Sequence, residues 1–287
     1  MTTPTPLDDI DFLSRSAHRV RVLRTLAEGP RTRPDLHEET GVSQPTLGRV
    51  LGSFGERNWV ERRGREYALT PFGDLLVEAF EDLLDTVETV QRLGDVLGQL
   101  PTGEMEFDLR EFRDATVYTP DSGDTLSHIR RMEEVWLGAD RARLLGSTLG
   151  PMSPEERRAH AVDALDGERR AETIVSASML ERGIELMTEV EMTSLAREFL
   201  ESGRAKGYLY DGPIPVILAI ADDTAMLAPT AENGIPTAVI ETENETVRSW
   251  VETRLDEYRE QSVELTVDDF PFSEDADGRG CRNVTDG

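Results

Sequence analysis

Residues 41–54, GVSQPTLGRVLGSF, decide the fold of the first part of the chain. Gly41 suits a tight turn, and Ser43 can cap a helix. Pro45 is tolerated just inside a helix because its missing N–H would be unpaired there anyway. The residues that follow have the spacing of an amphipathic helix, with the apolar set at Leu47, Val50, Leu51 and Phe54. The stretch therefore predicts a turn and then a helix over residues 45–58.

The segments on both sides complete a recognisable order. Residues 12–28 carry apolar side chains at helical spacing and predict a helix, which Gly29-Pro30 ends. Thr32 can cap a second, short helix, RPDLHEET, with Asp35 three residues later as an approximate capping box. After the third helix, residues 59–62 and 66–69 predict two strands joined by a basic turn, Arg63-Gly64-Arg65. The order is three helices followed by a β-hairpin.

Charge sets this first part apart from the rest of the chain. The whole sequence has 31 basic and 57 acidic residues and a formal net charge of −26. Residues 14–70 instead hold 11 arginines and 7 acidic residues, a net of +4, so the remainder carries −30. A locally basic segment inside an acidic chain is the electrostatic footprint of a nucleic-acid-binding domain.

The combination over residues 12–72 resembles the winged helix-turn-helix of archaeal and bacterial transcription regulators. In that fold the third helix presents its first two turns to base edges in the major groove, and the hairpin wing contacts phosphates or enters the minor groove. Gln44 would pair with adenine, Arg49 with guanine or a phosphate, and Thr46 with a thymine methyl or a phosphate. Some of the arginines could instead serve only as surface solubilisers. The candidate DNA-binding residues are Thr32, Arg33, Ser43, Gln44, Thr46, Arg49, Arg62, Arg63 and Arg65.

The composition of the whole chain indicates the salt conditions and the cellular compartment in which the protein works. Lys206 is the only lysine, and acidic residues are spread along the sequence. We interpret this as adaptation to a molar-salt cytoplasm, as in halophilic archaea; a merely acidic protein of ordinary salt is the alternative. The sequence has no run of about 18 apolar residues, no secretory signal pattern, and a single cysteine, Cys281. A cytoplasmic protein without membrane span, disulfide, metal site or cofactor is expected.

Residues 71–100 continue as a long helical pattern that predicts a linking helix. Gly94 stands where a further apolar residue is expected, and Pro101-Thr102-Gly103 ends the pattern. The apolar positions follow 4-3-4-3 spacing, which is the seam of a coiled coil over about three heptads. We expect this seam to form a homodimer, although it could pack on its own chain. The candidate dimerisation residues are Leu76, Phe80, Leu83, Val87 and Val90.

From about residue 104, short apolar runs alternate with helical segments. Strands separated by helices suggest an α/β sandwich with a mainly parallel central sheet. Residues 215–230, PVILAIADDTAMLAPT, predict two strands joined at the acidic turn Asp222-Asp223-Thr224. The expected strands are 115–119, 143–147, 173–177, 206–210, 216–221, 225–228 and 237–241, and the expected helices lie near 124–138, 153–165, 179–202 and 244–262.

This second half resembles the sensor domain of archaeal regulators in the methanogenesis-regulator and TrmB-like group. The resemblance covers residues 105–262 and rests on AETIVSASMLERGIELM, PVILAIADDTAMLAP and AVIETENETVRSWVETRLDEYREQS. It implies a phospholipase-D-like fold that is not catalytic. Phospholipase D chemistry uses a His-x-Lys-x₄-Asp motif, and Arg204 stands where its nucleophilic histidine would be, before Lys206 and Asp211. With no P-loop, GxGxxG or GxSxG motif either, we expect no enzymatic activity.

A binding pocket is the function expected of this half. Ligands of open α/β sheets bind beyond the carboxyl ends of the strands. Hydroxyl and carboxylate groups follow three of the predicted strands, and they suit a small polar metabolite. Ordinary helix caps and turns use the same residue types, so that interpretation stays open. The candidate effector-binding residues are Ser147, Thr148, Ser176, Ser178, Tyr210 and Asp211.

These features together predict an α/β multidomain protein. Residues 1–72 form a winged helix-turn-helix, 73–103 a linking and dimerisation helix, 104–265 an α/β effector-sensing domain, and 266–287 a disordered acidic tail. The expected function is a dimeric, sequence-specific transcription regulator that binds double-stranded DNA. A protein–protein adaptor, whose winged helix docks transcription machinery, is the alternative. The local charge of +4 and the arginine-tipped wing favour DNA.

Overall fold

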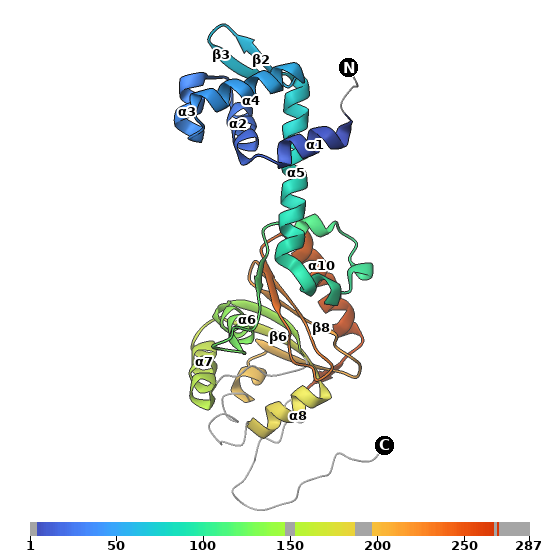
Figure 1. Cartoon of the computed structure of the whole chain (residues 1–287). Helices are drawn as coiled ribbons and strands as arrows, with labels where there is room; N and C mark the ends of the chain where they lie inside the picture. Colours follow the sequence, from blue (N-terminus) through green and yellow to red (C-terminus); the bar gives the residue numbers. More distant parts are fainter. Residues whose placement is uncertain (1–4, 147–152, 187–196, 267–268, 270–287) are drawn as a thin grey trace, which may run out of the picture. The chain divides into compact units, whose positions relative to one another are not determined.

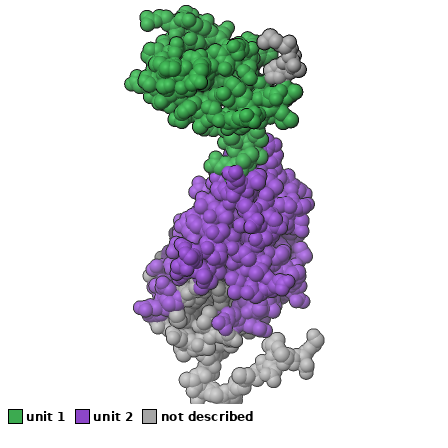
Figure 2. Space-filling view, in the orientation of Figure 1, with its two compact units in different colours: residues 1–88 green, residues 89–287 purple. Residues whose placement is uncertain are grey.

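The computed structural model describes residues 5–146, 153–186, 197–266 and 269 of the 287-residue chain (Figure 1). The chain divides into two compact units, residues 1–88 and residues 89–287, which are coloured separately in Figure 2. The division falls within one long helix, α5 (Pro71–Leu93). Apart from residues 266 and 269, the expected acidic tail lies outside the described residues.

The first unit is mainly helical. Its elements before α5 are α1 (Pro6–Ser14), α2 (Ala17–Ala27), β1 (Arg31–Thr32), α3 (Arg33–Thr40), α4 (Gln44–Glu56), β2 (Val60–Arg63) and β3 (Glu66–Leu69). The strands form a three-stranded antiparallel sheet in the order β1-β3-β2. The structure differs from expectation over residues 12–28, which belong to two helices. Ser16 has an extended backbone and starts α2 as its N-cap, while residues 12–14 end α1.

One apolar core holds the first unit together. Phe12, Phe54 and Trp59 come from α1, α4 and the start of the hairpin, and their ring centroids lie 5.9 to 6.2 Å apart. The guanidinium of Arg57 lies 3.8 Å from the centroid of Phe12, and its Nε donates to Asp9 at 3.0 Å. Burial of each such aromatic side chain contributes roughly 1.5–3 kcal/mol. The cluster therefore fixes α4 and the root of the hairpin against α1.

The second unit is built around an eight-stranded sheet in the order β11-β7-β6-β5-β8-β9-β10-β4. The parallel pairs are β5 with β6 and β6 with β7, and the other pairs are antiparallel. The strands are β4 (Thr116–Tyr118), β5 (Arg141–Gly146), β6 (Arg170–Ser176), β7 (Ala205–Tyr210), β8 (Val216–Ala221), β9 (Thr224–Pro229), β10 (Val239–Thr242) and β11 (Val263–Leu265).

The expected strands are all present, but the expectation of a mainly parallel sheet is wrong. Only two residues, Asp222 and Asp223, join β8 to β9, and so short a connection permits only antiparallel pairing. Asp222 has a φ of +49°, and its carboxylate accepts hydrogen bonds from the backbone N–H groups of Asp140 and Arg141. The turn therefore also fixes the start of β5. The edge strand β11 was not expected from the sequence.

Helices cover both faces of this sheet. The helices of this unit include α6 (Ser127–Gly138), α7 (Pro154–Asp166), α8 (Ala177–Leu186) and α10 (Glu245–Glu260). The alternation along β8 shows the two layers. Leu218 and Ile220 pack in a core with Val251 of α10, whereas Ala219 and Ala221 pack in another with Met132 of α6. The α/β class predicted for this half is confirmed.

Short 3₁₀ segments lead from α5 into the sheet. They are η1 (Gly94–Gln99), η2 (Thr102–Glu104) and η3 (Leu109–Phe112). Gly94 has a φ of +47°, which interrupts the α-helical backbone and ends α5 before the predicted limit at residue 100. Leu93, Val96 and Leu100 are buried in the core that also contains α10.

Candidate nucleic-acid interface

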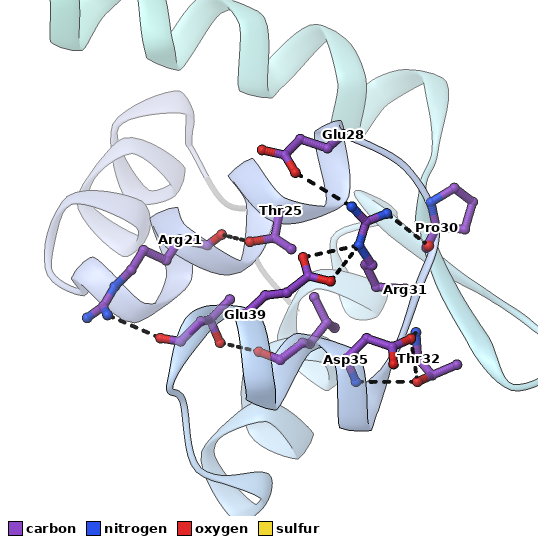
Figure 3. Close-up of polar contacts among 10 residues, drawn as sticks. Arg21, Thr25, Glu28, Pro30, Arg31, Thr32, Asp35 and Glu39 are labelled. Atoms are coloured by element: carbon purple, nitrogen blue, oxygen red, sulfur yellow. Dashed lines mark hydrogen bonds and ion pairs between the residues drawn. The ribbon is translucent and has the colours of Figure 1, made fainter.

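A capping box starts α3 at Thr32. The Thr32 hydroxyl oxygen accepts from the backbone N–H of Asp35 at 3.4 Å. The Asp35 carboxylate in turn accepts from the Thr32 N–H at 3.0 Å and from its hydroxyl at 2.7 Å (Figure 3). The side-chain hydrogen bond from Thr32, followed by the backbone one, holds the pKa of Asp35 below its usual range. The Thr32 hydroxyl is therefore occupied in capping the N-terminus of α3.

The turn between α3 and α4 depends on Gly41. This residue ends α3 with a φ of +68°, in the left-handed region that glycine adopts at little cost. Val42 is buried directly after it. Ser43 is the N-cap residue of α4, and its hydroxyl donates to the Thr46 hydroxyl oxygen at 3.0 Å. The helix-turn-helix predicted from residues 41–54 is thereby formed.

Arg31 holds the end of α2 to α3. Its guanidinium pairs with the carboxylate of Glu39 at 3.0 Å and with that of Glu28 at 3.5 Å (Figure 3). Arg21 on α2 donates to the backbone carbonyl of Thr40 at 3.2 Å. These contacts make the pair of helices rigid, and they place two of the unit's arginines in structural roles.

The two faces of α4 differ sharply. The inward face is apolar and buried, through Leu47, Val50, Leu51 and Phe54. A Cβ atom at Gly52 on the outward face would meet no atom within 4 Å, so packing within the unit does not require glycine there. Each exposed glycine inside a helix costs about 1 kcal/mol relative to alanine. The outward face is therefore nearly bare; its exposed positions are Pro45, Gly48, Arg49, Gly52, Gly55 and Glu56.

Gln44 and Arg33 form a reciprocal lock between α4 and α3. The Gln44 side-chain amide donates to the backbone carbonyl of Arg33 at 3.2 Å, and the Arg33 guanidinium donates to the backbone carbonyl of Gln44 at 2.6 Å. Both residues are half-buried. A Cβ at Gly48 would lie 3.2 Å from the Arg33 guanidinium, so this glycine leaves room for the lock.

The β2–β3 hairpin carries the wing arginines on an exposed two-residue turn, Gly64-Arg65. Arg62 donates from Nε to the backbone carbonyl of Gly64 at 2.9 Å and lies 5.9 Å from the ring centroid of Tyr67. Arg63 pairs with the carboxylate of Glu61 at 2.6 Å. Arg65 is exposed and makes no hydrogen bond or ion pair with the part of the chain that the structure describes.

Pairing with carboxylates separates the arginines of the first unit into two groups. Arg15, Arg24, Arg31, Arg57 and Arg63 each form an ion pair with an acidic side chain. Within the described residues the remaining arginines have no carboxylate partner, so no ion pair neutralises their charge. They are Arg19, Arg21, Arg33, Arg49, Arg62 and Arg65.

The apolar stripe of α5 is split between the core and solvent. Phe80 is buried in the core of the first unit, and Leu76 packs against the same core. This corrects the expectation that both face a partner chain: the apolar arc of α5 is wide, and one side of it packs in the core that also holds residues of α1, α2 and the hairpin. Leu83, Val87 and Val90 are exposed, by 42%, 43% and 55%. Phe72 and Leu75 are exposed on the same helix.

The candidate effector residues are only partly described. Ser147 and Thr148 lie outside the described residues. Ser176 and Tyr210 are register partners at the carboxyl ends of β6 and β7, as expected. The Ser176 hydroxyl oxygen accepts from the backbone N–H of Met179 at 3.3 Å and lies 3.0 Å from the Ser178 hydroxyl. The Ser176 hydroxyl therefore acts as a helix cap at the start of α8.

Tyr210 packs edge-on against Tyr258 of α10, with ring centroids 4.9 Å apart. Burial raises the pKa of the Tyr258 phenol. Asp211 follows β7 and is exposed. The Arg204–Asp211 spacing corresponds to no assembled nucleophile: Arg204 donates to the backbone carbonyl of Gly167, and Lys206 is exposed on β7.

Two further features are absent from the described part of the chain. No group of three or more His, Cys, Asp and Glu side chains in it could hold a metal ion. None of its helices is long and apolar enough to cross a membrane.

Two segments of the chain match the models of protein domain families. Residues 7–92 match the family model of the HVO_A0261 N-terminal domain, and residues 127–261 match that of the middle domain of the methanogenesis regulatory protein FilR1. The second unit is thus similar to a domain described from a methanogenesis regulatory protein, and the resemblance predicted from the sequence is confirmed at the level of these two domain models. No curated protein matches the sequence.

Several solved structures are similar to parts or most of the chain. TrmBL2, an archaeal chromatin protein, is 14% identical over 91% of this chain and 100% of its own, with a TM-score of 0.38. Ligand-free NadR is 20% identical over 37% of this chain and 85% of its own, with a TM-score of 0.26. Phosphatidylserine synthase of Haemophilus influenzae is 14% identical over 53% and 40%, with a TM-score of 0.37. These TM-scores are too low to show a shared overall arrangement.

Proposed function

We propose that this chain is a transcription regulator that binds double-stranded DNA through α4 and the β2–β3 hairpin. The observation that carries the proposal is the position of Arg49, Arg62 and Arg65, which are exposed on these two elements without carboxylate partners among the described residues. A helix in the major groove beside a basic hairpin is a common way to read a duplex. The match of residues 127–261 to a domain of a regulatory protein supports the same function.

A chain with a net charge of −26 can bind DNA if the contacts are local and the salt is high. At about 1 M salt the screening length is only ~3 Å, so the distant acidic residues repel the phosphates little. Counterion release also contributes less to affinity as salt rises. Binding then depends on close hydrogen bonds from a few arginines to the DNA. The exposed arginines of α4 and the hairpin are placed to donate such bonds.

The exposed side of α5 supports a homodimer. Phe72, Leu75, Leu83, Val87 and Val90 recur at intervals that keep them on one side of a helix with 3.6 residues per turn. All five are exposed, and a row of large apolar side chains in water indicates an interaction surface. A second copy on this surface would present two α4 helices to a roughly palindromic site.

In this proposal, residues 1–72 bind DNA, residues 73–103 link and dimerise, and residues 104–265 sense an effector. The effector is a small polar ligand or a partner, held near the carboxyl ends of β6 and β7, where Ser176 and Tyr210 are neighbours. It would act by favouring one spacing of the two α4 helices over another. Ser176→Ala and Tyr210→Phe would then weaken effector binding more than substitutions of exposed residues elsewhere in the second unit.

Selection of duplex DNA by the full chain tests the proposal. A random double-stranded library is incubated with the protein in about 2 M KCl, and bound sequences are recovered and read. We expect enrichment of a roughly two-fold-symmetric site. Arg49→Ala/Arg65→Ala should lose at least tenfold in affinity, which corresponds to about 1.4 kcal/mol. Arg15→Ala is the matched control, because Arg15 belongs to the same unit but pairs with Asp11.

Two outcomes would contradict the proposal that α4 and the hairpin bind DNA. If the wild-type chain enriches no duplex sequence between about 0.1 and 3 M KCl, α4 does not read DNA, and the adaptor function takes its place. If the Arg49→Ala/Arg65→Ala variant binds as tightly as the wild type, DNA binds another surface. Circular dichroism of each variant in the same buffer shows whether it is folded.

A further inference from the structure

We infer that Arg49 alone reads base edges from α4, through guanine, and that Gln44 takes no part in base reading. The inference rests on the proposed DNA-binding function and deepens it. From residue types alone, Gln44 is the natural partner of adenine and Arg49 that of guanine. The contacts made within the first unit separate the two side chains.

Gln44 is occupied inside the protein. Its amide donates to the Arg33 carbonyl at 3.2 Å, while Arg33 returns a hydrogen bond to the Gln44 carbonyl at 2.6 Å. To reach an adenine, Gln44 would have to give up its hydrogen bond to the Arg33 carbonyl of α3. Loss of such a bond opposes the gain from a base contact of similar kind. The two hydrogen bonds between Gln44 and Arg33 therefore hold the first turn of α4 in place. They also make the Gln44 side-chain amide unavailable for contact with a base.

The other polar side chains on the first turn reach less far. Ser43 donates to the Thr46 hydroxyl oxygen at 3.0 Å, and Thr46 is half-buried. Both side chains are short, and their mutual bond holds them against the helix. Pro45, which lies between them, has no polar side-chain group. The first turn thus offers the bases little beyond its backbone.

Arg49 has the opposite surroundings. Arg49 is exposed in the second turn of α4, and its side chain makes no hydrogen bond or ion pair within the described part of the chain. Gly48 precedes it and Gly52 lies three residues later, so no bulky side chain at these two neighbouring positions blocks its path. The exposed acid on the outward face, Glu56, is seven residues away, about two turns along the helix. A free guanidinium on a bare helix face suits a bidentate contact with guanine O6 and N7.

The test is a base-by-base affinity profile of the full chain on its selected site, in about 2 M KCl. Each base pair of one half-site is replaced in turn, and Kd is measured for wild type, Arg49→Ala, Arg49→Lys and Gln44→Ala. We expect one guanine position per half-site whose replacement weakens wild-type binding about tenfold or more. In Arg49→Ala, replacing that guanine should change Kd less than twofold. Arg49→Lys should keep part of the preference, because lysine also donates to guanine but not through a planar fork.

Gln44→Ala should keep the same profile, with any loss of affinity equal for every sequence. Two results would overturn the inference. One is an adenine preference present in the wild type and lost in Gln44→Ala. The other is an unchanged guanine preference in Arg49→Ala. Failure of the proposed function looks different, since the wild type would then show no sequence-dependent Kd at any position. Arg15→Ala serves again as the control, and its profile should match that of the wild type.

Discussion

Gly73 lies where two backbone segments of the first unit approach each other closely. A Cβ atom there would lie 2.0 Å from the carbonyl oxygen of Trp59 and 2.9 Å from its carbonyl carbon. The Gly73 N–H donates to the Thr70 hydroxyl oxygen at 3.1 Å, and the Thr70 N–H donates to the Trp59 carbonyl at 2.9 Å. The first turn of α5 is therefore fitted directly against the root of the hairpin.

We expect Gly73→Ala to lower the free energy of unfolding by about 1–3 kcal/mol or more, because backbone atoms must shift to admit the methyl group. Chemical denaturation of the full chain, followed by circular dichroism in about 2 M KCl, measures the change. Gly55→Ala is the control, since its Cβ would meet the nearest atom, the Val60 carbonyl oxygen, at 3.9 Å. Equal destabilisation by both variants would mean that the close approach at Gly73 is unimportant.

The capping box of α3 gives a pH-dependent contribution of known sign. The pKa of Asp35 is lowered by its hydrogen bonds from Thr32, so the unfolded chain binds a proton at Asp35 more readily than the folded chain. The contribution of Asp35 to stability is thus present above the unfolded pKa, about 3.9, and is lost as pH falls through the lower folded value.

We therefore expect Thr32→Ala to be less stable than wild type near neutral pH, with a difference that narrows below about pH 4. Thr32→Ser keeps the hydroxyl and should follow the wild type at every pH. Denaturation midpoints measured from about pH 7 to pH 3 provide the comparison. A difference between Thr32→Ala and wild type that is constant with pH would contradict the coupling to Asp35.

At the scale of elements, α4 combines a well-packed inner face with a glycine-rich outer face, and these glycines lower the stability of the helix. Gly52 is an example: packing does not require glycine there, because a Cβ atom would meet no atom within 4 Å. We expect Gly52→Ala to raise the free energy of unfolding by up to about 1 kcal/mol through helix propensity alone. The same methyl group would lie on the face proposed to enter the groove, so we expect DNA affinity to fall although stability rises.

Gly183→Ala in α8 is the matched control for this prediction. Gly183 is also helical, and a Cβ there would meet nothing within 4 Å. The Gly183→Ala variant should have a higher free energy of unfolding than the wild type and an unchanged affinity for DNA. Thermal unfolding and DNA titration on the same samples give both quantities. If Gly52→Ala gains stability and binds DNA as tightly as wild type, this part of α4 does not approach DNA closely.

Periodicity explains which elements could be predicted from the sequence. The spacing of Leu47, Val50, Leu51 and Phe54 is a property of one short segment, and it gave α4 correctly. The run VILAIA gave β8 for the same reason. The direction of strand pairing was not available in this way: the two-residue connection at Asp222-Asp223 indicated a hairpin, but the direction of the other pairs depends on contacts distant in sequence.

The candidate site shows the same limit more strongly. Residue types identified Gln44, Arg49 and Arg65 as polar groups on the segments that form α4 and the hairpin. Nothing local indicates that Gln44 bonds to the carbonyl of Arg33, eleven residues earlier, or that Phe80 is buried in the core of the first unit. A local signal does exist in the recurrence of glycine at positions 48, 52 and 55, which places all three on one helix face.

At the scale of the whole molecule, the exposed apolar stripe of α5 lies on an acidic helix. Residues 71–93 contain six carboxylates and one arginine. Glu78 and Asp82 are exposed and close in sequence to Leu75 and Leu83 of the stripe. Two copies that pair along this stripe would bring like charges together. Their repulsion extends over a screening length of about 30 Å at 0.01 M salt but only about 3 Å at 1 M salt.

We therefore expect the proposed dimer to depend on salt, with a dimerisation Kd at least tenfold weaker in about 0.1 M KCl than in about 2 M KCl. Sedimentation equilibrium measures this Kd, and circular dichroism at each concentration shows that the chain is folded. Leu83→Glu/Val87→Glu should be monomeric at both concentrations, because two charges would be buried without partners. Glu78→Gln/Asp82→Asn separates charge from the general effect of salt on apolar association. This variant should remain dimeric in 0.1 M KCl; if it dissociates as the wild type does, repulsion between the α5 helices is not the cause. A wild-type Kd that is equal at both concentrations would contradict the salt dependence itself.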